Sequence, residues 1–141
     1  METAAKTIEV SIWRGAEAGR YETFTVPLRE NQTVLDVVTH VQRNLDPTLS
    51  YRFACRVGVC GSCAMTVNGR PRWTCRTHVS KVVEDGKIEI GPLANLPVVK
   101  DLVPDLTQVY AQYRSVEPWL QAESPPPPDG ERAQSREERA K

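Results

Sequence analysis

The chain has 141 residues, enough for one folded domain and an additional arm, and 40% of them are hydrophobic, an ordinary value for a globular protein. Eighteen Lys and Arg residues balance eighteen Asp and Glu residues, so the net charge gives no reason to expect nucleic acid or an anionic membrane as a partner. No apolar run approaches the roughly 18–20 residues that span a bilayer, and the N-terminus lacks the apolar core of a secretory signal, so we expect a cytoplasmic protein.

Two strands are predicted at the start of the chain. Residues 7–13 alternate between apolar and polar side chains, with Ile8, Val10 and Ile12 on one face, which is the period of a half-buried strand. After a polar loop, residues 21–26 alternate in the same way. The pattern predicts a β-hairpin.

A helix is expected next. Thr33 can cap its N-terminus, with Asp36 three residues later in the position of a capping box. The helix ends at Asp46-Pro47, because proline cannot continue it. Its predicted apolar stripe is Val34, Val38, Val41 and Leu45.

Further strands follow a cysteine-rich loop. Residues 64–67 lead into Asn68-Gly69, a strong hairpin signal, and the chain returns through residues 72–75. A last strand is expected at 87–90, after an Asp85-Gly86 turn. These elements predict a small α+β domain over residues 1–97, with the helix lying across one face of the sheet.

The rest of the chain divides into two parts. Residues 98–123 are predicted to form a helical connector, with Pro104 at the first position of its helix. The apolar face of that helix would consist of Leu106, Val109, Tyr110 and Tyr113. Residues 124–141 begin with four prolines and are otherwise mostly charged or polar, so we expect a flexible, disordered tail.

The four cysteines have the spacing Cys55-x4-Cys60-x2-Cys63, and eleven residues separate Cys63 from Cys75. In a chain that is not secreted, four cysteines so close together in the sequence favour a bound metal or cluster over disulfide bonds. The spacing of the first three is that of plant-type [2Fe–2S] ferredoxins. Three thiolates would converge from one tight loop, and the fourth would arrive on the strand returning from the hairpin. We therefore predict a [2Fe–2S] cluster with these four cysteines as the iron ligands.

The same four cysteines are compatible with other chemistries. Structural zinc sites also use four cysteines, but usually as two Cys-x2-Cys pairs, and only Cys60 and Cys63 have that form. A redox-active dithiol at the same pair would leave Cys55 and Cys75 unexplained. The spacing favours the cluster, with zinc as the main alternative.

Two segments carry a resemblance to a known family. The run from Cys55 to Met65, CRVGVCGSCAM, resembles the cluster loop of the iron–sulfur subunit of succinate dehydrogenase and fumarate reductase. Residues 97–106 (PVVKDLVPDL) and 110–119 (YAQYRSVEPW) are similar to the connector that follows this domain in the family. The resemblance implies a β-grasp, plant-type ferredoxin-like fold that docks against an FAD-containing flavoprotein subunit. It also implies that Cys55, Cys60, Cys63 and Cys75 bind the [2Fe–2S] cluster.

The resemblance also implies what lies beyond this chain. In the family, a second domain carries a [4Fe–4S] and a [3Fe–4S] cluster on the way to a quinone, but here all four cysteines are already used. We therefore expect a separate or missing domain to carry those clusters. Contact with a membrane anchor would be indirect, holding the protein at the inner face of the cell membrane through partner subunits.

The leading functional hypothesis is electron transfer without substrate chemistry in this chain. The alternative is a free-standing soluble [2Fe–2S] ferredoxin that serves another oxidoreductase. In the leading hypothesis the loop from Cys55 to Cys63 faces the electron donor, with Arg56 at the contact. Val57 stands where many relatives have an acidic residue, a difference that would make the cluster easier to reduce.

Overall fold

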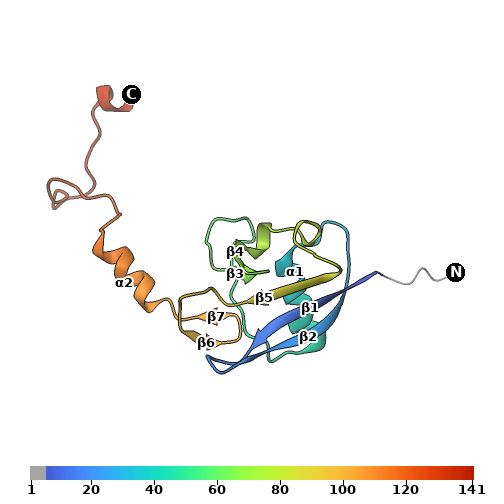
Figure 1. Cartoon of the computed structure of the whole chain (residues 1–141). Coiled ribbons are helices and arrows are strands. Elements are labelled where there is room, and N and C mark those ends of the chain that lie inside the picture. Colours follow the sequence, from blue (N-terminus) through green and yellow to red (C-terminus); the bar gives the residue numbers. More distant parts are fainter. Residues whose placement is uncertain (1–5) are drawn as a thin grey trace. The chain divides into compact units, whose positions relative to one another are not determined.

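The computed structural model describes residues 6–141, and a five-stranded mixed sheet dominates its first part (Figure 1). The strand order is β2-β1-β5-β3-β4. Strands β1 and β5 run parallel in the middle of the sheet, and every other neighbouring pair is antiparallel. The strands are β1 Thr7–Arg14, β2 Arg20–Pro27, β3 Ala64–Val67, β4 Arg70–Trp73 and β5 Lys87–Gly91. The predicted α+β, ferredoxin-like fold and its opening hairpin are confirmed.

The predicted capping box begins the first helix. In α1 (Val34–His40), the Thr33 hydroxyl accepts a hydrogen bond from the Asp36 N–H at 3.2 Å, and the Asp36 carboxylate accepts one from the Thr33 N–H at 2.9 Å. A π-helical turn, Val41–Leu45, continues it. Leu45 is 47% exposed, so the predicted apolar stripe is one residue too long.

The core lies between this helix and one face of the sheet. Alternate residues of β1 are buried, as the period of two predicted. A buried aliphatic side chain stabilises the fold by about 1.5–3 kcal/mol relative to an exposed one, so this layer holds the helix on the sheet. The sheet contributes Ile8, Val10, Ile12, Val26, Met65, Val67, Ile88 and Ile90, and the helix contributes Val34, Val37, Val38 and Val41.

The β3–β4 hairpin turns at the predicted dipeptide. Asn68 and Gly69 have φ angles of 47° and 76°, and a two-residue hairpin turn with both φ positive is of type I′. The Asn68 side chain donates to the Val82 carbonyl at 2.6 Å and accepts from the Glu89 N–H at 2.8 Å. The turn is therefore fixed to both segments that follow it.

Two features after the hairpin differ from the predictions. Strand β4 ends at Trp73, so Cys75 lies in a 3₁₀ turn, Thr74–Arg76, and not on the returning strand. Pro104 does not begin a helix, because it lies in β7 (Val103–Pro104), which pairs with β6 (Val98–Lys100).

This second hairpin is anchored by a buried carboxylate that the sequence did not reveal. Asp101 is 1% exposed, and its two oxygens accept hydrogen bonds from the Gly15 N–H at 2.8 Å and the Ser50 N–H at 2.9 Å. The Arg14 Nε lies 3.5 Å from the same carboxylate. Contacts group the described residues up to Leu106 into one compact unit, and the domain limit at residue 97 stays a prediction.

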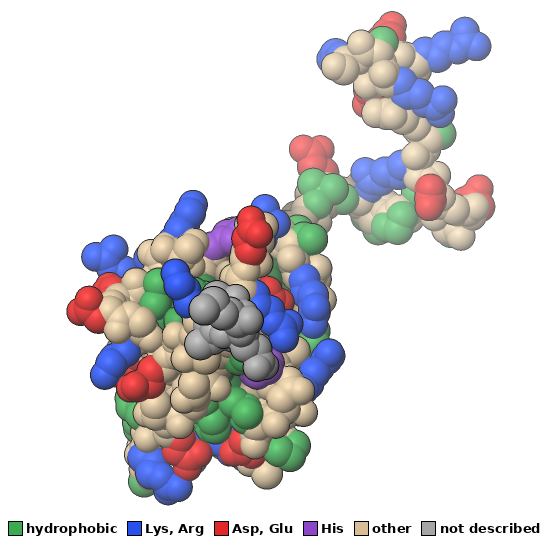
Figure 2. Space-filling view, turned by 90° about the vertical axis from the view of Figure 1, so that its right-hand side faces the viewer, with side chains coloured by type: hydrophobic (Ala, Val, Ile, Leu, Met, Phe, Trp, Pro, Cys, Tyr) green, Lys and Arg blue, Asp and Glu red, His purple; other side chains and the backbone are tan. Residues whose placement is uncertain are grey.

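The second unit, Thr107–Lys141, contains α2 (Thr107–Ser115) and α3 (Arg136–Arg139). All of its residues are exposed. The mobility expected for residues 124–141 stays a prediction. Among residues 6–141, no helix combines the length and the apolar content that crossing a bilayer requires. Basic and acidic side chains are interspersed on the face of the protein in Figure 2.

Candidate functional site

The four cysteines come from two neighbouring segments. Cys55, Cys60 and Cys63 lie on the loop that leads into β3, and Cys75 lies in the 3₁₀ turn after β4. Thr74 joins the segments, because its buried hydroxyl donates to the Cys63 carbonyl at 2.7 Å and its N–H reaches the same oxygen at 3.4 Å. The structure therefore brings Cys63 and Cys75 together, although Cys75 lies in a 3₁₀ turn and not on the returning strand, where it was expected.

The thiols are arranged as two pairs. The Cys55 and Cys60 side chains act on one another's pKa, and the Cys63 side chain acts on the pKa of Cys75, so the members of each pair lie close together. Cys63 and Cys75 are buried, Cys60 is exposed and Cys55 is intermediate. Over residues 6–141, no group of three or more His, Cys, Asp and Glu side chains is placed around a single ion. Two pairs of thiols are what a centre with two iron ions needs, because each iron would bind two protein thiolates.

The outer pair is surrounded by hydrogen-bond donors. The Cys55 Sγ accepts from the backbone N–H groups of Val57 at 3.4 Å, Val59 at 3.3 Å and Cys60 at 3.3 Å. These bonds lower the pKa of the Cys55 thiol, because they favour its charged form. The bond from the Cys60 N–H has the largest effect on this pKa.

Cys60 has its own donors, of which the Cys55 backbone N–H is the most effective, followed by Ser62. The Ser62 Oγ lies 3.0 Å from the Cys60 Sγ. Together they lower the pKa of the Cys60 thiol to about 6. Since the thiolate is the form that binds metal, the Cys60 thiol is prepared for a cation at neutral pH.

The inner pair has the opposite character. Burial raises the pKa of the Cys75 thiol, and the hydrogen bond with Cys63 raises it further, while the Gly58 N–H works against both. A coordinated metal deprotonates a thiol outright. Its positive charge would offset the free-energy cost of burying the charged thiolate of Cys75. The donor set of this chain therefore fits a [2Fe–2S] cluster with Cys55 and Cys60 on one iron and Cys63 and Cys75 on the other.

Glycine is required where the loop meets the turn. Gly58 has a φ of 76°, and a Cβ there would lie 3.0 Å from the Arg76 Cγ and 3.6 Å from the Trp73 Cε3. A larger residue would be strained and would push these two side chains away. The close approach keeps the Gly58 N–H directed at Cys75.

Sequence reasoning missed Thr74 and Ser62 as parts of the site. Thr74 bonds to a main-chain oxygen eleven residues away, and nothing in the local sequence marks such a contact. Ser62 could have been noticed, because it lies between two predicted ligands. Arg56 has a φ of 58°, and its guanidinium lies 4.7 Å from the centre of the Phe53 ring, so packing holds it beside the loop.

Comparisons with known proteins show the family to which this domain is similar. The family described as "2Fe-2S iron-sulfur cluster binding domain" matches residues 7–111, which include all four cysteines. The chain is 40% identical to the fumarate reductase iron-sulfur subunit of Mycobacterium tuberculosis (strain CDC 1551 / Oshkosh), over 91% of its own length and 53% of the relative's. It is 44% identical to the succinate dehydrogenase iron-sulfur subunit of Paracoccus denitrificans, over 89% of its own length and 48% of the relative's.

A solved structure titled "Mycobacterium smegmatis Sdh1 complex in the apo form" contains a similar chain, with a TM-score of 0.76 and 33% identity. The similarity covers 93% of this chain and 55% of that one. The chain thus spans about half the length of the relatives it matches. These matches favour a [2Fe–2S] cluster over zinc, and a relationship to these subunits over a free-standing ferredoxin.

Proposed function

The chain belongs to the 2Fe-2S iron-sulfur cluster binding domain family, and from that premise we propose that it transfers single electrons as the N-terminal half of an iron–sulfur subunit. The complex would be of the succinate dehydrogenase or fumarate reductase kind. The observation that carries this proposal is the arrangement of Cys55, Cys60, Cys63 and Cys75 as two thiol pairs. When bound, the cluster supplies one-electron redox chemistry.

The protein residues set how easily an electron is accepted. Three backbone N–H groups point at the Cys55 sulfur, and hydrogen bonds to the sulfurs are among the factors that set the reduction potential of a cluster. They stabilise the added negative charge without any movement of the chain. Because Cys60 is exposed and Cys75 is buried, electrons would enter and leave most readily on the side of Cys60.

The proposed partners are those that the resemblance to succinate dehydrogenase and fumarate reductase implies, and the relatives, which are iron–sulfur subunits of such enzymes, support them. An FAD-containing flavoprotein subunit would donate electrons, and a polypeptide segment carrying [4Fe–4S] and [3Fe–4S] clusters would pass them on toward quinone. The assembly would lie at the inner face of the cell membrane, held there by its partners. In this arrangement the dicarboxylate chemistry belongs to the flavoprotein, and this chain connects it to the later clusters.

The decisive experiment is an EPR spectrum of the anaerobically purified, dithionite-reduced protein, with iron and acid-labile sulfide measured on the same sample. We expect a rhombic spin-half signal of about one spin per chain, with iron and sulfide in equal amounts. A protein that holds zinc and gives no such signal would refute the proposed function.

Variants test the ligand assignment. Cys60→Ala removes an exposed ligand, and we expect it to lose the EPR signal while its far-ultraviolet circular dichroism stays that of a folded domain. Ser62→Ala is the matched control, because it lies in the same loop and removes only the 3.0 Å contact to the Cys60 sulfur. It should keep the full signal with a changed midpoint potential. A full signal in Cys60→Ala would contradict the assignment.

A further inference from the structure

The zero net charge of the chain hides a strongly basic segment. Between Asp46 and Glu84 the sequence contains no Asp or Glu. The same stretch contains all four cysteines, and its basic residues are Arg52, Arg56, Arg70, Arg72, Arg76 and Lys81. All acidic residues of the chain lie outside the segment that holds the site.

On one side of the ligand loop the basic residues line two adjoining pockets. Arg72 and Arg76 line a pocket of about 360 Å³ together with Trp73, beside the point where Gly58 meets the turn. Arg72 also lines a neighbouring pocket of about 350 Å³, whose other basic residues are Arg70 and Lys81. One carboxylate, that of Glu84, also lines this second pocket, so basic side chains are in excess from the loop to the edge strand β4.

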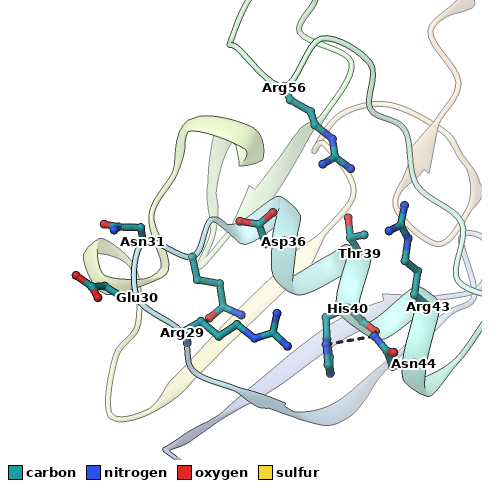
Figure 3. Close-up of a pocket in the computed structure, with 10 residues that line it drawn as sticks. Arg29, Glu30, Asn31, Asp36, Thr39, His40, Arg43, Asn44 and Arg56 are labelled. Carbon is teal, nitrogen blue, oxygen red and sulfur yellow. Dashed lines mark hydrogen bonds between the residues drawn. The ribbon is translucent and has the colours of Figure 1, made fainter.

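On the other side, Arg56 connects the loop to a third pocket. This pocket of about 330 Å³ is also lined by Arg29, His40 and Arg43 (Figure 3). Figure 3 shows Arg56 reaching into it from the ligand loop, opposite α1. One of its two carboxylates, that of Asp36, already accepts the capping hydrogen bond at the start of α1.

The cations around the site take part in no ion pair among residues 6–141. The ion pairs among the described residues involve Arg14, Arg20, Lys87 and Lys100. No ion pair within residues 6–141 involves the basic residues around the site, which are Arg29, Arg43, Arg56, Arg70, Arg72, Arg76 and Lys81. Their charge is therefore available to a partner.

Between the two basic sides lies an apolar centre. Val57 is 60% exposed and Val59 is 81% exposed, and both lie in the loop that holds the exposed Cys60. An apolar centre with a charged rim is the usual anatomy of a protein–protein interface. Val57, Val59 and the unpaired cations on either side are called the basic docking surface below.

We propose that the basic docking surface binds a protein partner through acidic side chains that surround the partner's own redox centre. This inference rests on the proposed function, since the partner is the electron donor, and it adds the chemistry by which that donor is recognised. Opposite charges speed the encounter of two proteins and fix their orientation. The pocket of Arg29, Arg43 and Arg56 would receive carboxylates of the donor.

A rival role for the same cations is to offset the negative charge of the cluster and its thiolates. The two roles differ in what they change. Cations that serve only the cluster set its midpoint potential, whereas cations that dock a partner set the rate of encounter and its dependence on salt.

The test uses the reduced, cluster-loaded full chain and two small oxidants, the anion [Co(EDTA)]⁻ and the cation [Co(NH₃)₆]³⁺. Each Co(III) takes one electron from the protein and becomes Co(II). As ionic strength rises from about 0.01 M to about 0.3 M, we expect oxidation by the anion to slow and oxidation by the cation to accelerate, because salt screens the local field. A rate independent of salt for both oxidants would overturn the inference.

Charge-reversal variants show which part of the surface produces the positive electrostatic potential. Arg72→Glu and Arg43→Glu, one on each side of the loop, should each slow oxidation by [Co(EDTA)]⁻ at low salt severalfold, and together about tenfold. Their midpoint potentials should stay close to that of the unaltered protein. Arg20→Glu is the matched control on β2, the opposite edge of the sheet from β4, and should leave the rate unchanged. An equal effect of all three variants would contradict a localised surface.

A polymer tests for an acidic macromolecule directly. Polyaspartate should compete with [Co(EDTA)]⁻ and slow the reaction at low salt, whereas polylysine of the same length should not. No competition by polyaspartate would overturn the acidic-partner inference. Failure of the proposed function is distinguishable, because it appears beforehand as a missing EPR signal, whereas failure of this inference appears in a protein with its full signal.

Discussion

The two units of the chain use similar local signals with different results. Each contains a helix that begins with a capping box, formed by Thr33 and Asp36 in the first unit and by Ser135 and Glu138 in the second. The first helix has four buried residues and lies in the core, while every residue from 107 to 141 is exposed.

The difference shows where helical stability comes from. α1 has seven residues and α2 has nine, and isolated helices of either length are marginal in water. α1 is held by the sheet beneath it. In the second unit, apolar side chains such as Tyr110, Val116 and Leu120 are 61%, 71% and 96% exposed, so they have no core of their own. The first unit should therefore carry the folding energy of the chain.

The largest expected effect is on a core residue of the first unit. Ile90 is fully buried on β5 and pairs with Ile12 of β1 and Val67 of β3. Ile90→Ala should lower the free energy of unfolding by about 2–5 kcal/mol, through lost burial and the cavity left behind. Urea denaturation followed by circular dichroism measures this change in the free energy of unfolding. Val116→Ala, in the second unit, should change nothing, and equal losses in both variants would break the comparison.

A smaller but still large effect is expected at the buried carboxylate. Asp101→Asn removes a buried charge that lies 3.5 Å from the Arg14 Nε and weakens the acceptor of two backbone N–H groups, although Arg14 keeps its ion pair with Asp46 at 3.1 Å. We expect the free energy of unfolding to fall by about 1–3 kcal/mol. Hydrogen exchange should accelerate at the Gly15 and Ser50 amides, which donate to Asp101. Asp129→Asn in the exposed tail is the control. Unchanged protection of the two amides would show that the second hairpin is held by its apolar contacts alone.

The two capping boxes give a direct test of the comparison. Thr33→Ala should destabilise the protein by about 1 kcal/mol, because the Asp36 N–H loses its acceptor at the start of a packed helix. Ser135→Ala removes the equivalent bond, 3.2 Å from the Glu138 N–H, and should leave the global unfolding midpoint where it is. A similar loss in both variants would mean that the second unit unfolds together with the first.

The smallest effect is expected from removing the second unit altogether. A chain that ends at Leu106 should unfold within about 0.5 kcal/mol of the full protein, since changes away from packed features rarely exceed this value. Its EPR signal should also be intact. A loss of more than about 1 kcal/mol would contradict the independence of the first unit.

Local sequence determined much of this protein. The start of α1 depends on residues three positions apart, and the β3–β4 turn on the adjacent Asn68 and Gly69, so neighbours in sequence were enough to predict both. The same holds for the cysteine set, because three of its members lie within one short loop whose spacing is characteristic of the cluster.

Tertiary structure decided the remainder. The pairing of Cys63 with Cys75, the turn that carries Cys75, and the gathering of unpaired arginines on both sides of the ligand loop depend on segments that meet only after folding. So does the extent of the first compact unit, which reaches Leu106 and includes the bond from the Gly15 N–H to Asp101, 86 residues apart in the chain. Such contacts leave no period or short motif in the sequence, since their free energy depends on burial and geometry that only the assembled sheet provides.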